Sequence, residues 1–573
     1  MLGWMVHMKR RTGLIVIFIY FIIQACSLPF VGMTWDEPSS FFFGRTALHF
    51  YLTGNRAYVT DANYADPKLF GNDPFGYIFG EDVYPPFPFV IASITSAIFA
   101  ETLHIMSPLT AHHLGLLFLG IIGVLAMYGI GLTLRWSTTI SLGIALLYGT
   151  YPTIVAQMRN DAKDAPLMSM IVLFVYMAIN WLFSMKQGGK RNFLWGIGTG
   201  VGLGLALASK PTAAIIVPIF SVWFVFSYAI FRSFRNKIGS IPKLIIPALF
   251  IGVVSLAIFF ISWPWLWDDP FGKITAVWNF FKVVGRGMPT LYLGTVYQAG
   301  FNLPWHYPFV IFGVQTPITV LGIGLIALIA PLWIVFKKRD PIPLLFLFWI
   351  IIGMGRFFVP GVLIYAKVRH FIDVLPAFFI LIGVLLNEVV SSKHQVVSEK
   401  KTPRFKFLPT NYFLLTTKLC LCIMLLEQVW VIGTHFPYEP SYFNAFIGGT
   451  KTVAEKKLFD IEYWASGVKD AMKYIERVTQ SDQPATVYAC TMAHLALFYE
   501  SPHVKVTSNP AGATYTLVPN SASWFGGAEA FMRQNNDLVY TVRRNGGDLF
   551  YVFKHKSYSG WNCGQETNMV YKR

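Results

Sequence analysis

Two adjacent carboxylates, Asp36 and Glu37, stand directly after the first long apolar run of the chain, residues 13–31. Such a run has about the ~20 residues that a helix needs to cross a hydrocarbon core. The two acids are therefore among the first polar groups beyond a predicted membrane span. Carboxylates at such a boundary can accept a proton or pair with a cation. The alternative is that they cap a membrane helix or begin a turn.

A second acidic group, Asp161 with Lys163 and Asp164, lies between two later apolar runs, close to Arg159. It falls on the same side of the membrane as Asp36, because two predicted spans, residues 112–134 and 138–157, lie between the two groups. The sequence allows two interpretations: a loop that binds a substrate or a cation, or a solvated turn in which the opposite charges neutralise one another.

Three cationic side chains on that side complete the candidate chemistry. Lys210 interrupts a hairpin between two apolar runs, and Arg369 and His370 open a later run. A lysine there is costly unless it reaches water, an anion or an acid, and the simplest alternative is that it extends to the headgroups. An anionic lipid phosphate would satisfy both cations, because arginine offers a planar fork and lysine a point charge.

Composition identifies the solvent in which these groups must work. Of the 573 residues, 54% are hydrophobic and 13% are charged. Most of this apolar surface needs lipid around it. In a membrane protein, the formal net charge of +17 indicates basic cytoplasmic loops rather than nucleic-acid binding. The N-terminus has a basic start but no small-residue cleavage site, so we interpret it as a retained first span.

The hydropathy pattern predicts a mainly α membrane protein, a polytopic helical bundle of about eleven spans. With a cytoplasmic N-terminus, every short basic cluster falls on the cytoplasmic side, as the positive-inside rule requires. The C-terminus is then extracytoplasmic. The predicted spans cover residues 13–31, 112–134, 138–157, 165–184, 193–209, 212–231, 244–263, 316–336, 342–360, 371–390 and 412–434.

The first outer loop, residues 32–111, contains one more apolar segment, Pro85–Met106. If this segment crossed the membrane, every later basic loop would face outward. It also opens with three prolines and carries Glu101 and His104 near its end. We therefore expect it to lie at the outer interface as a helix packed on the bundle.

The chain divides into a transmembrane domain, residues 1–434, and a tail, residues 435–573, with a different pattern. A helix-like stretch, Ala465–Val478, precedes four short runs of strand character at Thr486–Ala489, Thr514–Val518, Leu538–Val542 and Leu549–Phe553. This order predicts a small α/β extracytoplasmic domain. We see no internal repeat along the chain.

Several motifs, taken in order, carry a resemblance to a known family. Trp35-Asp36-Glu37 resembles the acidic motif of the polyprenyl-phosphate-sugar-dependent glycosyltransferases of the C-type membrane superfamily, which includes protein O-mannosyltransferases and the lipid A aminoarabinose transferase. Asn160–Pro166 is similar to that family's second acidic loop, although Asp161 stands where a less charged residue is expected. The similarity continues through Ser209-Lys210-Pro211, Pro304–Pro308, Gln315-Thr316-Pro317, Arg369-His370-Phe371, Leu375-Pro376, Tyr438–Phe443 and Tyr463-Trp464.

The resemblance implies an inverting glycosyltransferase on the outer face of a plasma membrane. Its donor would be a sugar on a polyprenyl phosphate, and its acceptor a hydroxyl or amine of a glycan, lipid or protein. Asp36 would be the general base, with Glu37 positioning the acceptor or tuning Asp36. Lys210, Arg369 and His370 would bind the donor phosphate. The second acidic loop, Asp161, Lys163 and Asp164, would orient the acceptor or hold a divalent cation, although no metal site is required.

The competing class is a transporter or lipid flippase, in which charged groups also line a path. Such proteins commonly show internal repeats and interrupted helices at mid-membrane, whereas here the ionisable groups gather at one interface. A catalytically inactive relative that assists assembly is a third class, and the intact acids at Asp36 and Glu37 argue against it. The sequence leaves the sugar and the acceptor open.

Overall fold

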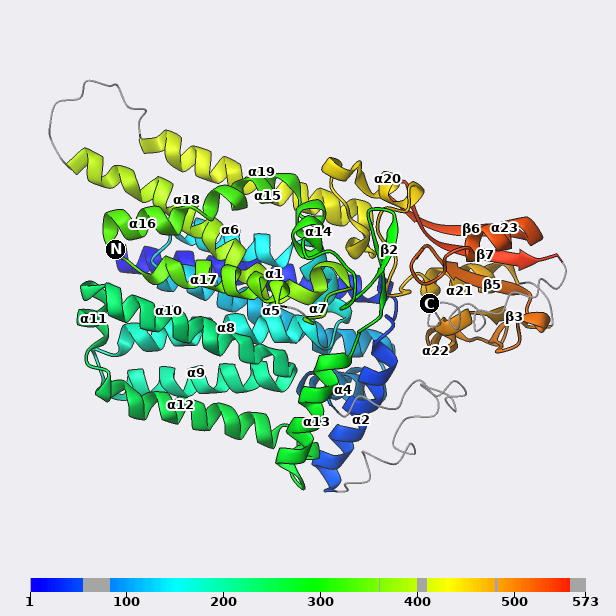
Figure 1. The fold of residues 1–573 in the computed structure, drawn as a ribbon, viewed down its shortest axis with the longest axis horizontal. Coiled ribbons are helices and arrows are strands. Elements are labelled where there is room, and N and C mark those ends of the chain that lie inside the picture. Colours follow the sequence, from blue (N-terminus) through cyan, green and yellow to red (C-terminus); the bar gives the residue numbers. More distant parts are fainter. Residues whose placement is uncertain (1, 55–82, 360, 399–409, 480–482, 557–573) are drawn as a thin grey trace.

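The computed structural model describes residues 2–54, 83–359, 361–398, 410–479 and 483–556 (Figure 1). The acids of the first outer loop from Asp61 to Asp82 and most of the predicted inner loop Ser391–Phe407 lie outside these residues. The described chain consists of a large helical bundle with a smaller strand-containing domain at one end (Figure 1).

The predicted helical bundle is confirmed. Its described residues contain nine helices that are long and apolar enough to cross a membrane, or ten if the pair α6 and α7, bent by 66°, counts as one span. The predicted span 342–360 forms a shorter helix, α17. The bundle helices are α1 (Leu2–Ser27), α5 (Pro108–Thr133), α6 (Thr138–Gly149), α7 (Pro152–Asn160), α8 (Asp164–Ser184), α9 (Gly189–Ser209), α10 (Ile216–Ile230), α12 (Pro242–Ile261), α15 (Ile318–Ala327), α16 (Ala330–Lys338), α17 (Ile342–Gly355), α18 (Leu375–Ser398) and α19 (Thr410–His435).

Helices α5 and α8 form the centre of the bundle, and α12 lies at its edge. The apolar windows of α5 and α8 are 72% buried, against 17% for α12. Glycines allow the close packing that holds such helices together in lipid. A Cβ at Gly202 of α9 would lie 2.9 Å from the Cα of Phe174 in α8, so a larger residue there would push the two backbones apart.

Shorter elements cover the end of the bundle that faces the C-terminal domain. They include α2 (Glu37–Thr53) and α4 (Phe87–Ser96), which continues as a π-helical turn, Ala97–Thr102. The segment predicted at the interface is thus helical and shorter than a full span, and its depth in the membrane stays a prediction. The other elements at this end are α13 (Pro270–Val283), α14 (Tyr307–Gln315), α20 (Gly449–Glu455) and the hairpin β1 (Pro289–Tyr292) and β2 (Thr295–Gln298). The short helix α11 (Arg232–Ile238) lies at the opposite end of the bundle (Figure 1).

The tail forms the predicted α/β structure. All four expected strands are present, in a mixed sheet of order β4-β3-β5-β7-β6, and the expected helix is α21 (Val468–Val478). A three-residue strand, β4, was not predicted because it is too short to show alternation. The elements are β3 (Ala485–Tyr488), α22 (Ala493–Ala496), β4 (Val504–Val506), β5 (Tyr515–Pro519), α23 (Ala528–Asn535), β6 (Asn536–Arg544) and β7 (Gly547–His555).

Buried polar contacts fasten this domain to the bundle. Lys469 of α21 donates to the carbonyls of Pro29 (2.6 Å) and Val31 (2.9 Å), just beyond the first span. Arg159 of α7 forms a 2.5 Å ion pair with Glu439, and both side chains are at most 2% exposed. Breaking one partner of such a buried pair is costly. The domain therefore has a fixed position over the end of the bundle.

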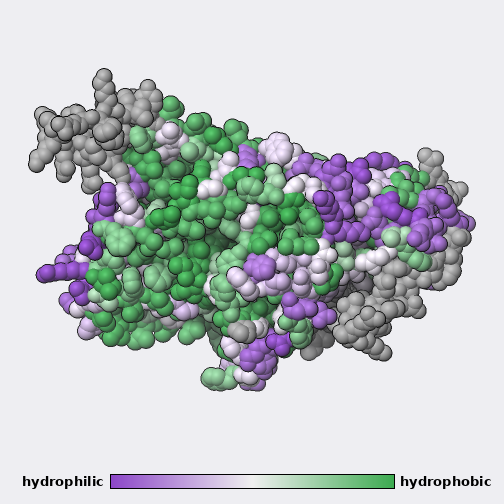
Figure 2. Space-filling model, turned by 45° about the horizontal axis from the view of Figure 1, so that its top comes forward, coloured by the Kyte–Doolittle hydropathy of each residue, from purple (hydrophilic) through white to green (hydrophobic). Residues whose placement is uncertain are grey.

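Hydrophobic side chains cover the bundle, and hydrophilic ones gather over the C-terminal domain and at the opposite end (Figure 2). That opposite end carries α11 and the last turn of α16, with the basic residues Arg232, Arg235, Lys237, Lys337 and Lys338 (Figure 1). Because cytoplasmic loops are enriched in lysine and arginine, we expect this end to face the cytoplasm.

Cysteine labelling tests this orientation. Ser508 and Ser240 are exposed serines, in the C-terminal domain and in the turn that follows α11, respectively. In intact cells, a membrane-impermeant maleimide should label Ser508→Cys and should label Ser240→Cys only after the membrane is opened. Labelling of the unsubstituted chain measures the background from its native cysteines. Labelling of Ser240→Cys in intact cells would contradict this orientation and would place the α11 end outside the cell.

Candidate active site

A cavity of about 310 Å³ lies where the bundle meets the C-terminal domain. Its walls come from distant parts of the chain: the start of α2, the α7–α8 loop, α13, β1, the segment before α18, and the C-terminal domain. Its charged lining residues are three acids and three cations: Asp36, Asp460, Glu462, Lys163, Lys367 and Arg369. Asp36 of the first acidic pair, Lys163 of the second acidic loop and the Arg369 cation thus face one space.

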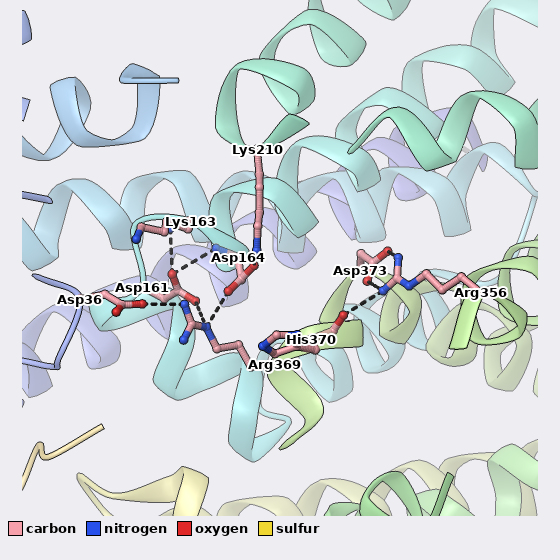
Figure 3. A network of polar contacts seen from close by, with 9 residues as sticks. All are labelled: Asp36, Asp161, Lys163, Asp164, Lys210, Arg356, Arg369, His370 and Asp373. Carbon is pink, nitrogen blue, oxygen red and sulfur yellow. Dashed lines mark hydrogen bonds and ion pairs between the residues drawn. The ribbon is translucent and has the colours of Figure 1, made fainter. Parts of the chain in front are cut away.

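Arg369 connects the two predicted acidic motifs (Figure 3). Its Nε donates to Asp164 Oδ2 at 2.7 Å, and its Nη2 donates to Asp36 Oδ2 at 2.7 Å. The guanidinium also lies over the ring of Trp464, 4.5 Å from its centroid. No acceptor among the described residues takes the N–H groups of Nη1, which leaves one edge of the fork for a ligand.

The two adjacent acids, Asp36 and Glu37, point to different surroundings. Asp36 precedes α2, and its side chain is 29% exposed. Glu37 begins α2 and is 1% exposed; its Oε1 is 2.6 Å from His113 Nε2, and its Oε2 accepts from the backbone N–H of Thr34 at 2.5 Å. Glu37 does not line the cavity. Its contacts fix the start of α2 against α5, so any effect on a substrate passes through the position of Asp36.

The second acidic loop is buried, and its interpretation as a solvated turn is wrong. Asp161, Lys163 and Asp164 are each at most 4% exposed. Asp161 Oδ1 accepts the backbone N–H groups of Lys163 (2.8 Å) and Asp164 (3.1 Å), which satisfies donors at the start of α8. Its Oδ2 lies 3.9 Å from Arg369 Nε. Of the three, Lys163 lines the cavity, with its ammonium 4.4 Å from the centroid of the Tyr84 ring.

Two residues predicted to bind phosphate, Lys210 and His370, lie behind the residues that line the cavity. Lys210 donates to Asp164 Oδ1 at 2.5 Å and does not line the cavity. The ring of His370 lies edge-on to Tyr365 at 4.2 Å, and its carbonyl accepts from Arg356 at 2.9 Å. Tyr365 lines the cavity, whereas His370 does not. Lys210 and Arg369 therefore both pair with Asp164. The side chain of His370 is separated from the cavity by Tyr365.

Lys367 is a cavity residue that the sequence analysis did not select. Its side chain is 5% exposed, and its Nζ donates to the carbonyls of Ile461 (3.1 Å) and Pro440 (3.3 Å). No carboxylate of the described residues lies within 4.0 Å of it. Its backbone φ is +56°, which is uncommon for a lysine. The ammonium also lies over the rings of Phe443 and Tyr463, 5.1 and 4.9 Å from their centroids. A buried cation held by neutral carbonyls and rings is costly unless an anion completes the site.

The surrounding charges set the protonation states of two acids. Burial alone would raise the pKa of Asp36, but the positive charges of Lys163 and Arg369 outweigh it and lower the pKa. Burial and the charge of Asp164 raise the pKa of Asp161 to about 7. Near neutral pH, Asp36 is therefore ionised and can accept a proton, while Asp161 holds its proton for part of the time.

The other two acids of the cavity are committed to the fold. Asp460 accepts four hydrogen bonds, from Ser521 Oγ, from the N–H and Oγ of Ser523, and from Leu291 N–H, at 2.6 to 3.2 Å. Glu462 accepts three, from the N–H of Trp464 and from the N–H and Oγ of Ser466. Both carboxylates anchor loops. Among the acids that line the described cavity, Asp36 alone keeps an oxygen, Oδ1, without such a bond.

Glu427, within the predicted span 412–434, is satisfied by a neighbouring helix. Its carboxylate accepts from the N–H groups of Ile318 (2.8 Å) and Thr319 (2.9 Å) at the start of α15.

A divalent cation was a second possibility for the acidic loop. The described residues contain no group of three His, Cys, Asp or Glu side chains arranged to hold a metal. Asp36 and Asp164 already pair with Arg369 and Lys210, so the acids of the site do not fit a cation.

Comparison with known proteins supports the resemblance. Residues 107–274 match the family model of the dolichyl-phosphate-mannose-protein mannosyltransferases. The resemblance is confirmed over this segment. The matched segment contains the second acidic loop and Lys210, whereas Asp36 and Arg369 lie outside it. No curated protein sequence matches the chain.

Similar solved structures include two transferases. The structure of ArnT from Cupriavidus metallidurans bound to undecaprenyl phosphate is 13% identical, with a TM-score of 0.48, and the match covers 96% of this chain and 98% of that chain. The archaeal oligosaccharyltransferase AglB from Archaeoglobus fulgidus, in complex with an inhibitory peptide and a dolichol-phosphate, is 11% identical, with a TM-score of 0.49, and the match covers 95% and 74%. At these values no residue role is transferred from either protein.

The titration of Asp161 predicts a pH-dependent stability. Its folded-state pKa of about 7 lies above its ordinary value of 3.8, so the folded chain holds the proton more tightly than the unfolded chain. The resulting stabilisation is complete below the ordinary value and is lost as the pH rises through about 7. Asp161→Asn keeps an acceptor oxygen and cannot ionise. Thermal unfolding of the purified protein at pH 5 and pH 8 should therefore show a smaller loss of Tm for Asp161→Asn than for the unsubstituted chain.

The matched control for this measurement is Asp268→Asn, since Asp268 is 57% exposed and lies between α12 and α13. Its loss of Tm over the same interval should equal that of the unsubstituted chain. Equal losses for Asp161→Asn and the unsubstituted chain would show that Asp161 does not bind a proton near neutral pH.

Proposed function

We propose that this chain is a membrane glycosyltransferase that moves a sugar from a polyprenyl-phosphate donor to a hydroxyl group of an acceptor, with inversion at the anomeric carbon. The observation that carries the proposal is the pairing of Asp36 with Arg369 at the cavity wall, 2.7 Å apart. A proton acceptor and a phosphate-binding fork thus stand side by side, at the end of a bundle that matches a mannosyltransferase family over residues 107–274.

Asp36 is the general base of this proposal. It lines the cavity, its lowered pKa keeps it ionised at neutral pH, and its Oδ1 accepts no hydrogen bond from the described residues. A positioned general base contributes about 10²–10⁴ in rate. The acceptor hydroxyl gives its proton to Asp36 while its oxygen bonds to the anomeric carbon, and the bond from that carbon to the phosphate oxygen breaks.

Arg369 links the two charge changes of this step. Asp36 loses a negative charge when it takes the proton, and the departing polyprenyl phosphate gains one as it changes from a diester to a monoester. Total charge is unchanged, and the guanidinium that was paired with Asp36 is available to the phosphate. Stabilisation of developing charge by a preorganised donor is the electrostatic part of such catalysis.

For the donor phosphate we propose Arg369 and Lys367, which both line the cavity. Lys210 acts through Asp164, with which it pairs, and holds the carboxylate that orients Arg369. His370 supports the ring of Tyr365. The cationic set predicted from sequence is thereby divided into one residue that contacts the phosphate and two that position its surroundings.

The site belongs on the outer face of the plasma membrane in this proposal, with the donor delivered laterally from the bilayer. Support comes from the concentration of basic residues at the opposite end of the bundle. A transporter or flippase would need ionisable groups along a path through the bundle, whereas the described cavity lies at one end. The position of Asp36 in this cavity supports a site at the junction with the C-terminal domain.

Replacing Asp36 should separate chemistry from donor binding. Asp36→Asn keeps the shape of the side chain and removes its basic oxygen, so transfer should fall by about 10² or more. A bare polyprenyl phosphate should still bind, because the cations remain. The first readout is mass spectrometry of envelope glycans and polyprenyl-linked sugars in a deletion strain that carries each variant. The second is binding of the lipid to the purified chain.

Asp268→Asn removes an exposed acid from an outer loop and should leave both readouts unchanged. Wild-type glycan levels in cells that express Asp36→Asn at normal abundance would remove Asp36 as the base. An unchanged lipid and glycan profile on deletion of the chain itself would contradict the proposed function.

Replacing Lys367 should weaken donor binding. Lys367→Gln keeps hydrogen-bond donors for the two carbonyls and removes the charge. A charge-assisted hydrogen bond contributes about 1.5–3 kcal/mol, so affinity for a polyprenyl phosphate should fall about tenfold to a hundredfold. Because Lys367 and Arg369 share one ligand, the double variant with Arg369→Gln should depart from the sum of the single effects.

The control is Lys457→Gln, which removes a 48% exposed lysine outside the cavity. Affinity is measured by titrating the lipid into purified protein, and Tm confirms that each variant is folded. Unchanged affinity in folded Lys367→Gln would place the phosphate elsewhere.

A further inference from the structure

Trp524 is an aromatic residue of the cavity wall whose ring is not used by the fold. It lies in the turn between β5 and α23 and is 41% exposed. Across the described residues, its ring makes no ring–ring or cation–π contact, and its indole N–H has no acceptor. The neighbouring Trp464, in contrast, carries the guanidinium of Arg369. The ring face and the N–H donor of Trp524 are therefore both available to a ligand.

The turn that carries Trp524 is held firmly. Ser521 and Ser523, on its N-terminal side, together give three hydrogen bonds to Asp460, which is 8% exposed. The same carboxylate accepts from Leu291 of β1, on the bundle side of the cavity. One buried acid therefore joins the turn to β1. The position of Trp524 results from this anchoring rather than from packing of its own ring.

Phe525, the next residue, anchors the other side of the turn. It packs on the small apolar cluster that contains Val518 and Met532. The chain then reverses at Gly527, whose φ of +84° favours glycine. With both flanks fixed, the indole is preorganised at the rim, and preorganisation lowers the entropic cost of binding a ligand.

The shape and charge of this wall indicate the ligand. An indole offers a flat apolar face and one N–H donor, which together match a sugar ring, with its C–H face and its surrounding hydroxyl oxygens. The charged lining residues from the C-terminal domain are Asp460 and Glu462, and both carboxylates already accept hydrogen bonds from the fold, which leaves neither to select a cationic group. The surface of the C-terminal domain is hydrophilic, unlike the lipid-facing bundle (Figure 2), and this disfavours an acyl chain.

We infer that Trp524 is the stacking platform for a neutral sugar ring of the acceptor, so that the acceptor is a glycan. This inference rests on the proposed function. The donor phosphate is assigned to Arg369 and Lys367, at the start of the α18 span, whereas Trp524 belongs to the C-terminal domain on the opposite wall. An acceptor arriving from the aqueous side meets Trp524, and a donor arriving from the membrane meets the cations.

Saturation-transfer NMR on the purified full chain in detergent tests the inference. The probes are methyl α-mannopyranoside, methyl β-glucopyranoside and the methyl glycoside of N-acetylglucosamine, with a serine-containing hexapeptide as the non-sugar probe. At least one glycoside should give a signal with the unsubstituted chain. The signal should fall about fivefold or more in Trp524→Ala and be largely kept in Trp524→Phe, which still offers a stacking face.

The matched control is Trp305→Ala, because Trp305 is 62% exposed and lies outside the cavity lining. Its glycoside signal should be unchanged. Equal glycoside signals in Trp524→Ala and the unsubstituted chain would overturn the inference. So would a signal that depends on Trp524 for the peptide and not for the glycosides.

Two further lipid titrations decide whether the sugar ring belongs to the acceptor or the donor. A bare polyprenyl phosphate and a polyprenyl-phosphate mannose should each bind Trp524→Ala as they bind the unsubstituted chain. A weaker affinity for the mannose-bearing lipid alone would assign Trp524 to the donor sugar and overturn the acceptor assignment.

Failure of this inference is distinguishable from failure of the proposed function. Asp36→Asn should keep the glycoside signal, because Asp36 is not part of the stacking surface. Loss of the glycoside signal in Trp524→Ala alone supports the platform independently of turnover.

Discussion

The pairing of Arg369 with Asp36 and Asp164 is the constraint on which the rest of the site depends. A guanidinium that is 11% exposed at the end of a membrane bundle is costly unless carboxylates meet its fork. The two acids are 128 residues apart along the chain, and Arg369 lies another 205 residues beyond Asp164. Satisfying one cation therefore fixes the start of α2, the start of α8 and the segment before α18 in a single arrangement.

The neighbouring groups follow from the need to keep this cluster close to neutral. Lys210 takes the second oxygen of Asp164, so Arg369 does not have to neutralise that carboxylate alone. Asp161 has no equivalent cation at short range, and its raised pKa lets it hold a proton instead. Asp36 is the acid of this cluster that lines the cavity. Arg369 lines the cavity as well. In the proposed function, the donor phosphate can replace Asp36 beside the guanidinium, and the arginine keeps an anionic partner throughout.

The sequence predicted the bundle, the strands of the C-terminal domain and the segments of the site, because each produces a local signal. A span needs about twenty apolar residues, and a buried charge beside one is rare. The orientation of single side chains was harder to predict. Glu37 was grouped with Asp36, but successive residues of a helix point about 100° apart, and the two carboxylates diverge. His370 was likewise grouped with Arg369 because the two are adjacent in sequence, but its ring faces Tyr365.

Lys367 and Trp524 were missed because nothing local marks them. The ammonium of Lys367 is held by carbonyls of residues 440 and 461, and its backbone takes a left-handed conformation that sequence does not reveal. Trp524 is one of 17 tryptophans in a chain rich in aromatic residues, and its exposure depends on the anchoring of its turn by Asp460. Both residues become visible as members of a site only when the C-terminal domain is docked on the bundle.

This docking gives the domain a role beyond covering the membrane region. The bundle supplies Asp36, Lys163 and Arg369 to the cavity, and the domain supplies Trp524 and the anchored Ser521–Phe525 turn. In the proposed function, a lipid-linked donor reaches the first set along the bilayer and a water-exposed acceptor reaches the second. Such a transfer needs one space that both substrates can enter from different directions. The cavity at the junction of the two domains has this arrangement, and the buried Arg159–Glu439 pair is one of the contacts that join them.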